Sequence, residues 1–155
     1  MSAAPVEVRL ARTAEERRLA YELRHRVFVV EQRVPVELER DEHDEGALHV
    51  VALEAGETVG TGRLVAQPGG VGRVGRMAVR ADRRRRGVGE RVLELLENLA
   101  RERGLSEIEL HAQAQVERFY LRAGYRAEGE HFDEAGIDHV LMRKRLSPEP
   151  PTPGS

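Results

Sequence analysis

The apolar positions of the chain recur with two different periods, and the changes between them predict the elements. Residues 6–12 alternate apolar and polar side chains, which is the period of a half-buried strand. Thr13, with Glu16 three positions later, forms a capping box that starts a helix. Apolar side chains spaced four apart, up to Val27, give this helix one buried face. The chain therefore begins with a strand and an amphipathic helix.

After this helix the pattern becomes irregular and polar. Residues 33–46 contain Pro35 and a dense acidic set, which together predict a loop with its carboxylates in solvent. Alternation then returns in two strands, roughly 47–54 and 57–66, joined by a short turn. A further strand ends near Val79. This part of the chain is predicted to be a meander.

The last third of the chain returns to the helical period. Apolar residues from Val88 fall on a single face of a helix that Gly104 closes. A strand at 106–112, a short helix at 115–124 and a hairpin at 125–146 follow. The order of elements predicts one mixed α/β sheet with helices on its faces.

Composition narrows the class of protein. With 155 residues, the chain fits one domain, which we place at 1–146, with a Pro-rich and disordered tail at 147–155. A 40% hydrophobic and 34% charged content with a net charge of -2 is that of an ordinary globular protein, and argues against a dedicated nucleic-acid binder. The absence of cysteine excludes disulfides and thiolate chemistry. No apolar run approaches the roughly 20 residues that span a bilayer, so we expect a cytoplasmic protein without membrane contact.

One charged stretch interrupts this balance. The stretch "RRRRGVG", Arg83 to Gly89, lies between a predicted strand and a predicted helix. Unpaired N–H groups of a first helical turn attract anions, and glycine at 87 and 89 leaves room for a phosphate beside them. The spacing fits neither a Walker loop nor a dinucleotide G-x-G-x-x-G motif. The residues themselves therefore predict a loop that binds a pyrophosphate.

The same residues resemble a known family. "RRRGVG" is similar to the R/Q-x-x-G-x-G/A signature of the GNAT superfamily of N-acetyltransferases, and "GRMAV" and "FYLRAGY" stand where that family has its cofactor strand and its aromatic segment. "LRHRVFVVEQ", "DEHDEGALHVV" and "EAGIDHVLM" resemble the ElaA-like subgroup. The resemblance covers most of residues 6–146. It implies a single-domain α/β fold with a mixed, mostly antiparallel central sheet and helices on both faces.

The resemblance also implies an activity and a site. The expected reaction is transfer of the acetyl group of acetyl-CoA to a primary amine by direct attack in a ternary complex. Tyr120 would protonate the departing thiolate, and backbone N–H at the end of the strand would polarise the thioester. The expected cofactor-binding residues are Met77, Ala78, Val79, Arg84, Arg85, Arg86, Gly87, Val88, Gly89, Glu90, Gln113 and Tyr120. No metal site is expected.

The base that would deprotonate the acceptor is left open among Glu31, His49, Glu109 and His111. His111 is slightly favoured, because it alternates with apolar residues and so lies on the open face of its strand. Glu31 is kept beside it. Gln113, seven positions before Tyr120, stands where many family members have asparagine.

Three alternatives accompany this interpretation. The chain could be an acyl-CoA-binding regulatory module without turnover, or the arginines could contact nucleic acid. The acidic cluster at 41–45 could hold a metal, although its spacing is more typical of a solvated loop that draws a basic acceptor. The acceptor amine, small molecule or peptide, and the oligomeric state stay open, with a homodimer as one option.

Overall fold

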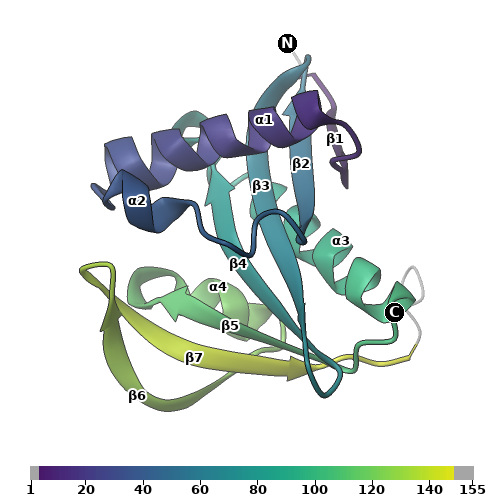
Figure 1. The fold of residues 1–155 in the computed structure, drawn as a ribbon, viewed down its shortest axis with the longest axis vertical. Coiled ribbons are helices and arrows are strands. Elements are labelled where there is room, and N and C mark those ends of the chain that lie inside the picture. The colour runs from purple at the N-terminus through teal and green to yellow at the C-terminus, as the bar shows by residue number, and fades with distance from the viewer. Residues whose placement is uncertain (1–3, 149–155) are drawn as a thin grey trace.

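The computed structural model describes residues 4–148, and in these residues one sheet carries all the strands (Figure 1). The order across the sheet is β1-β2-β3-β4-β5-β7-β6. The strands are β1 Val6–Leu10, β2 Leu48–Glu54, β3 Glu57–Gln67, β4 Val71–Val79, β5 Glu107–Gln113, β6 Arg126–Glu134 and β7 Ile137–Arg145. The helices are α1 Ala14–Arg24, α2 Val36–Glu39, α3 Val88–Glu102 and α4 Glu117–Arg122.

The first helix begins as the sequence predicts. Thr13 Oγ1 accepts a hydrogen bond from the backbone N–H of Glu16 at 3.1 Å, and Glu16 Oε1 accepts one from the N–H of Arg12 at 3.0 Å. The first bond satisfies an N–H that the helix leaves unpaired, and the second ties down Arg12, the residue before the N-cap Thr13. Beyond α1 the chain continues in a wider π-helical segment, His25–Glu31. The predicted capping box is confirmed.

The helices cover both faces of the sheet. In β2, Val50 and Ala52 belong to the core cluster that contains the buried side of α3, whereas Val51 and Leu53 pack with Ala20 of α1. This split follows from the pleat, because successive side chains of a strand point to opposite faces. Figure 1 shows α1 crossing the sheet on one side and α3 on the other. The predicted fold class is confirmed.

One joint in the sheet differs from the others. Every pair of neighbouring strands is antiparallel except β4 and β5, which run parallel. They pair only from Val71 to Val74, against Glu107 to Leu110, and then diverge (Figure 1). The last residues of β4 are therefore bonded to β3 alone among the described strands. Their other backbone edge faces an opening in the sheet.

A bulge marks the start of this free segment. The register between β3 and β4 shifts between Thr61 and Arg63, and Arg76 opposite this shift has a φ of 54°. The left-handed region is uncommon for a residue with a side chain. The extra residue bends β4 away from β5 and increases its twist.

Two sequence expectations need comment. The segment predicted to be a loop contains the short helix α2, so this part of the prediction is wrong. Most of the predicted tail, 149–155, lies outside the described residues. In the described part of the chain, no helix has both the length and the apolar character needed to cross a membrane.

Candidate active site

The loop after β4 leads directly into α3. Gly87 is the N-cap of α3 and has a φ of 82°, a conformation that costs a side-chain-bearing residue roughly 1 kcal/mol or more. Arg85 is also left-handed, with a φ of 65°. No side chain caps this helix N-terminus among the described residues. The predicted arrangement of strand, loop and helix N-terminus is present, with the first N–H groups of a long helix available to an anion.

A glycine is required at position 89 by close packing against α4, and not by the room for a phosphate that we expected. A Cβ built at Gly89 would lie 3.3 Å from Cζ of Phe119 and 3.7 Å from Cγ2 of Val79. The missing side chain therefore lets the first turn of α3 pack closely against Phe119 of α4. We expected Gly89 to make room for a phosphate, but the side of the residue that it leaves bare is filled by an aromatic ring.

The arginines of the loop are not equivalent. Arg83 forms an ion pair with Glu54 at 2.7 Å, so much of its charge is locally neutralised. Arg84 binds both carboxylate oxygens of Glu31, at 2.6 and 2.9 Å, and its Nε donates to the carbonyl of Val79 at 2.9 Å. Arg85 and Arg86 are exposed and form no hydrogen bond or ion pair with the residues that the structure describes. The unpaired positive charge of the run thus lies next to Gly87.

The bond between Arg84 and Glu31 also affects the carboxylate. Hydrogen bonds from Arg84 hold the pKa of Glu31 below its usual range. Both oxygens of this side chain are engaged, and a carboxylate that holds its charge more tightly is a weaker proton acceptor. Glu31 therefore lies beside the predicted cofactor loop, but in a state that does not suit a base.

Tyr120 lies on α4 with its ring in the core. Its side chain packs edge-to-face against Phe119 and Tyr125, with ring centroids 4.9 and 5.8 Å apart. Burial raises the pKa of Tyr120 and keeps the phenol protonated. Its hydroxyl forms no hydrogen bond with a described residue, whereas the Tyr125 hydroxyl donates to Glu97 at 2.8 Å. Tyr120 thus holds a proton that no described side chain accepts.

Gln113 lies at the end of β5, where the strand has separated from β4. Its Nε2 donates to Oε1 of Gln32 at 2.8 Å, and Gln115 donates to its Oε1 at 3.0 Å. Gln32 follows the π-helical segment, so this contact joins the two sides of the opening. Sequence spacing cannot detect it, because the two residues are 81 positions apart.

His111 is held on the open face of β5 by three neighbours. Its Nδ1 is 2.9 Å from Oε1 of Glu134, and its Nε2 is 3.0 Å from Nη2 of Arg73. Arginine can only donate, so Nε2 accepts and Nδ1 carries the proton toward Glu134. The ring also packs edge-to-face on Phe132, with centroids 5.1 Å apart.

The other two base candidates are differently placed. His49 is buried in β2, with Nε2 2.9 Å from the carbonyl oxygen of Asp44, and burial lowers its pKa. It lies two strands away from β4, on the side remote from the opening. Glu109 is ion-paired with Arg73 at 3.5 Å and with Arg143 at 3.3 Å. Of the four candidates, His111 alone has an acceptor ring nitrogen on a strand that borders the opening.

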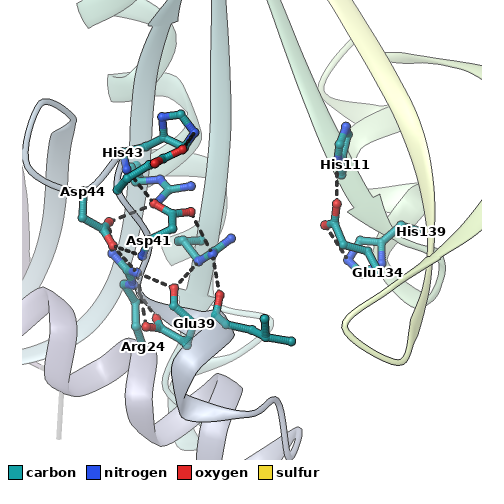
Figure 2. A network of polar contacts seen from close by, with 12 residues as sticks. Arg24, Glu39, Asp41, His43, Asp44, His111, Glu134 and His139 are labelled. Carbon is teal, nitrogen blue, oxygen red and sulfur yellow. Dashed lines mark hydrogen bonds and ion pairs between the residues drawn. The ribbon is translucent and has the colours of Figure 1, made fainter.

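The acidic cluster is solvated only in part: Glu42 and Glu45 are exposed as expected, whereas Asp41 and Asp44 bind internal arginines, and for these two the expectation is wrong. Asp44 is 7% exposed and binds Arg24, which is 1% exposed, at 2.7 Å. Arg24 also bonds Glu39 at 2.5 Å, and Asp41 bonds Arg63 at 2.8 Å (Figure 2). We call Arg24, Glu39, Asp41, Asp44, Arg63 and Arg76 the buried arginine network. Its carboxylates are consumed by internal cations and are not free to attract a basic acceptor.

A signal for this network does exist in the sequence. Arg24 falls one position after Leu23 and three before Val27, inside the apolar stripe of the first helix. An arginine at a core position needs a carboxylate partner. In the described residues, no group of three or more His, Cys, Asp or Glu side chains is arranged to hold a metal ion.

The chain also matches a known protein family. A family model described as "Acetyltransferase (GNAT) domain" matches residues 10–146. The chain belongs to the GNAT acetyltransferase family. It is 38% identical over 136 residues to the uncharacterised N-acetyltransferase YjcF of Bacillus subtilis (strain 168), covering 87% of this chain and 96% of YjcF.

Solved GNAT structures share the fold. The chain matches the crystal structure of a protein named as a putative N-acetyltransferase from Lactobacillus plantarum with a TM-score of 0.84 and 32% identity, over 92% of this chain and 99% of that one. It matches Escherichia coli ElaA with a TM-score of 0.81 and 23% identity, over 90% and 99%. The ElaA-like resemblance of the sequence is confirmed, and the protein is an acyltransferase of the GNAT type.

The family also indicates the class of donor. An aminoglycoside 6′-N-acetyltransferase complexed with coenzyme A has the same fold, with a TM-score of 0.73 and 18% identity, over 95% of this chain and 99% of that one. The GNAT fold is thus one that can hold coenzyme A.

Proposed function

We propose that this GNAT protein transfers the acetyl group of acetyl-CoA to a primary amine of a small-molecule or peptide acceptor in the cytoplasm. The observation that carries the proposal is the opening between β4 and β5. We assign three groups to this gap: the unpaired backbone edge of β4, the N-terminus of α3 and the buried phenol of Tyr120 on α4. These are the three groups that acyl transfer from a thioester requires: a donor for the oxyanion, an anion site and an acid.

The residues present suit the donor substrate. A thioester laid along Met77–Val79 would meet the free backbone edge of β4, where an N–H can stabilise the negative charge that grows on the carbonyl oxygen during attack. Gly87 and the first N–H groups of α3 suit the pyrophosphate. Arg85 and Arg86 offer unpaired positive charge beside it.

The proposed reaction is a direct attack within a ternary complex. The acceptor ammonium first loses a proton to a base, and its nitrogen lone pair then forms a bond to the thioester carbon. The C–S bond breaks, and Tyr120 donates its proton to the leaving sulfur. The phenolate then takes the excess proton from the new amide nitrogen, which returns Tyr120 to its neutral state. Burial keeps the phenol protonated between turnovers but also makes it a weaker acid, so proton transfer to sulfur depends on close contact with the leaving group.

An experiment on Tyr120 separates turnover from binding. Tyr120→Phe should retain acetyl-CoA binding by titration calorimetry, while thiol release in a single turnover falls on the order of 10²–10⁴-fold. Tyr125→Phe is the matched control, because it removes an equally buried phenol that already donates to Glu97. Acetyl-CoA binding without thiol release from a broad amine panel would instead favour a regulatory acyl-CoA-binding module.

A further inference from the structure

The tip of the β6–β7 hairpin reaches the opening from the face that α1 covers. Ile137, the first residue of β7, packs against the cluster of Leu23, Val27, Phe28, Val34 and Ala78. Ala78 belongs to the free end of β4, where we place the thioester. The hairpin therefore bridges the gap between the two diverging strands, and side chains beside its tip lie next to the place of acyl transfer.

Three strands present side chains on this face in register. Gln113 of β5 stands opposite His139 of β7, which stands opposite Phe132 of β6. His111 lies two residues before Gln113 on β5, and Glu134 lies two residues after Phe132 on β6. Both side chains therefore point to this same face. The ring of Phe132 lies between the two imidazoles, edge-on to His111 at 5.1 Å and stacked on His139 at 6.0 Å. Figure 2 shows Glu134 reaching from its strand between the two histidines.

These contacts orient one nitrogen of His111. Glu134 Oε1 accepts the Nδ1 proton at 2.9 Å, which leaves the lone pair on Nε2. The second oxygen of Glu134 lies 3.8 Å from Nε2 of His139, whose Nδ1 is bonded to the carbonyl of Ile137 at 2.7 Å. A carboxylate behind an imidazole fixes its tautomer and stabilises the imidazolium that forms when the ring accepts a proton.

We propose that His111 is the base of the acyl transfer and that Glu134 is its positioning residue. This inference rests on the proposed function. The acceptor ammonium gives one proton to Nε2 of His111, the imidazolium is stabilised by Glu134, and the freed amine attacks the thioester. Tyr120 serves the leaving sulfur as described above, and His111 returns its proton to solvent before the next turnover.

In this structure, Arg73 makes the hydrogen bond to His111 that the proposal gives to the acceptor ammonium. Its Nη2 donates to Nε2 of His111, as the ammonium would. Its Nε is buried without a hydrogen-bond partner and lies 3.5 Å from Oε1 of Glu109. The proposal requires Arg73 to release Nε2 of His111 when the acceptor ammonium binds, with Glu109 remaining as its partner. Without an acceptor, the hydrogen bond from Arg73 keeps the lone pair of His111 on Nε2, the nitrogen that does not contact Glu134.

The test compares two glutamates of the same strand. Glu134→Gln removes the carboxylate behind His111, and Glu130→Gln removes an equal charge from an exposed position with no described contact. Glu134→Gln should lower kcat about tenfold or more with the KM for acetyl-CoA unchanged, since a one-unit change in proton affinity is worth that factor. The acid limb of the pH profile should move to lower pH, because the imidazolium loses its negative neighbour. Glu130→Gln should change neither.

The pH profile has to be interpreted with all the charged neighbours of His111 in view. These are Arg73 on β4, Glu109 on β5, Glu134 on β6, and His139 and Arg143 on β7. His111→Ala should lose thiol release on the order of 10²–10⁴-fold and recover part of it with added imidazole. Full activity of His111→Ala, or an unshifted acid limb in Glu134→Gln, would overturn the proposal.

A measurement without turnover separates this inference from the proposed function. Nitrogen-15 NMR of the imidazole should show His111 protonated at Nδ1 in the wild-type protein, with Nε2 protonation appearing in Glu134→Gln. Protonation at Nε2 in the wild-type protein would overturn the inference. The expected tautomer in a protein that releases no thiol with any amine would leave Glu134 as the positioning residue and refute the proposed function instead.

Discussion

Arg24 and His111 both bind a carboxylate from a distant part of the chain, but their surroundings differ. Arg24 is 1% exposed, and its guanidinium donates to Glu39 and Asp44 in a buried set of contacts. The side chain of His111 is 26% exposed, and that of its partner Glu134 is 47% exposed. The two groups lie apart in Figure 2. A buried guanidinium held by several carboxylates stabilises the fold, whereas an imidazole with solvent beside it can exchange a proton.

Removing the central cation should give the largest effect. Arg24→Ala leaves Glu39 and Asp44 buried without their main partner, so the free energy of unfolding should fall by about 3–5 kcal/mol. Glu134→Gln, on the exposed pair, should change it by less than about 0.5 kcal/mol. Urea unfolding followed by circular dichroism measures both. Equal losses in the two variants would show that the two regions do not differ in this way.

The second largest effect should be the loss of stability in acid, which we expect from the buried arginine network and not from the His111–Glu134 pair. Burial alone would raise the pKa of Asp44, but hydrogen bonds from Arg24, and then from Arg63, hold it well below its usual range. A depressed pKa stabilises the fold above the unfolded value near 4, and this stability is lost as the pH falls toward the folded value. The loss should be roughly 1 kcal/mol between pH 6 and pH 3 for this one carboxyl.

The measurement is the free energy of unfolding as a function of pH. In Asp44→Asn this part of the dependence should be absent, although the protein is less stable throughout. The slope of Glu130→Gln, which lacks an exposed carboxylate without described partners, should match that of the wild-type protein. An unchanged acid slope in Asp44→Asn would show that Asp44 does not carry the difference.

The smallest effect should come from the hydrogen bond between Gln32 and Gln113, which crosses the opening between β4 and β5. Gln32→Ala removes the amide contact to Gln113 across the opening, where Gln113 keeps a bond from Gln115. The expected loss of stability is about 1 kcal/mol or less, the usual value for one hydrogen bond. Thermal unfolding measures it. A loss of stability several times larger would show that this contact contributes more than one ordinary hydrogen bond to the pairing of the two halves of the sheet.

The fold was predictable because its signals are local. Alternating residues define β2 and β3, and Ala55 and Gly56 have the left-handed φ values of 51° and 80° that their tight turn requires. The loop motif around Gly87 is local as well, and its place before α3 is where the sequence puts it. Such features depend on residues a few positions apart.

The features that the sequence analysis missed depend on distant partners. Arg84 meets Glu31 across 53 positions, and Gln113 meets Gln32 across 81. Asp41 and Asp44 look solvated in the sequence because their partners Arg24 and Arg63 lie about 20 positions away. Gly89 shows the same limit, because the ring that fills its bare side comes from another helix. The roles assigned to Tyr120 and His111 stay predictions.

The chain contains one lysine, Lys144, and its ammonium is fully engaged. It donates to both oxygens of Glu97, at 3.1 and 3.2 Å, and to the carbonyl of Ala123 at 2.8 Å. These bonds use all three N–H donors of the ammonium, so attack on a thioester would first require them to break. The single lysine of this acyltransferase is thus already bound, and its modification should be slow even in excess acetyl-CoA.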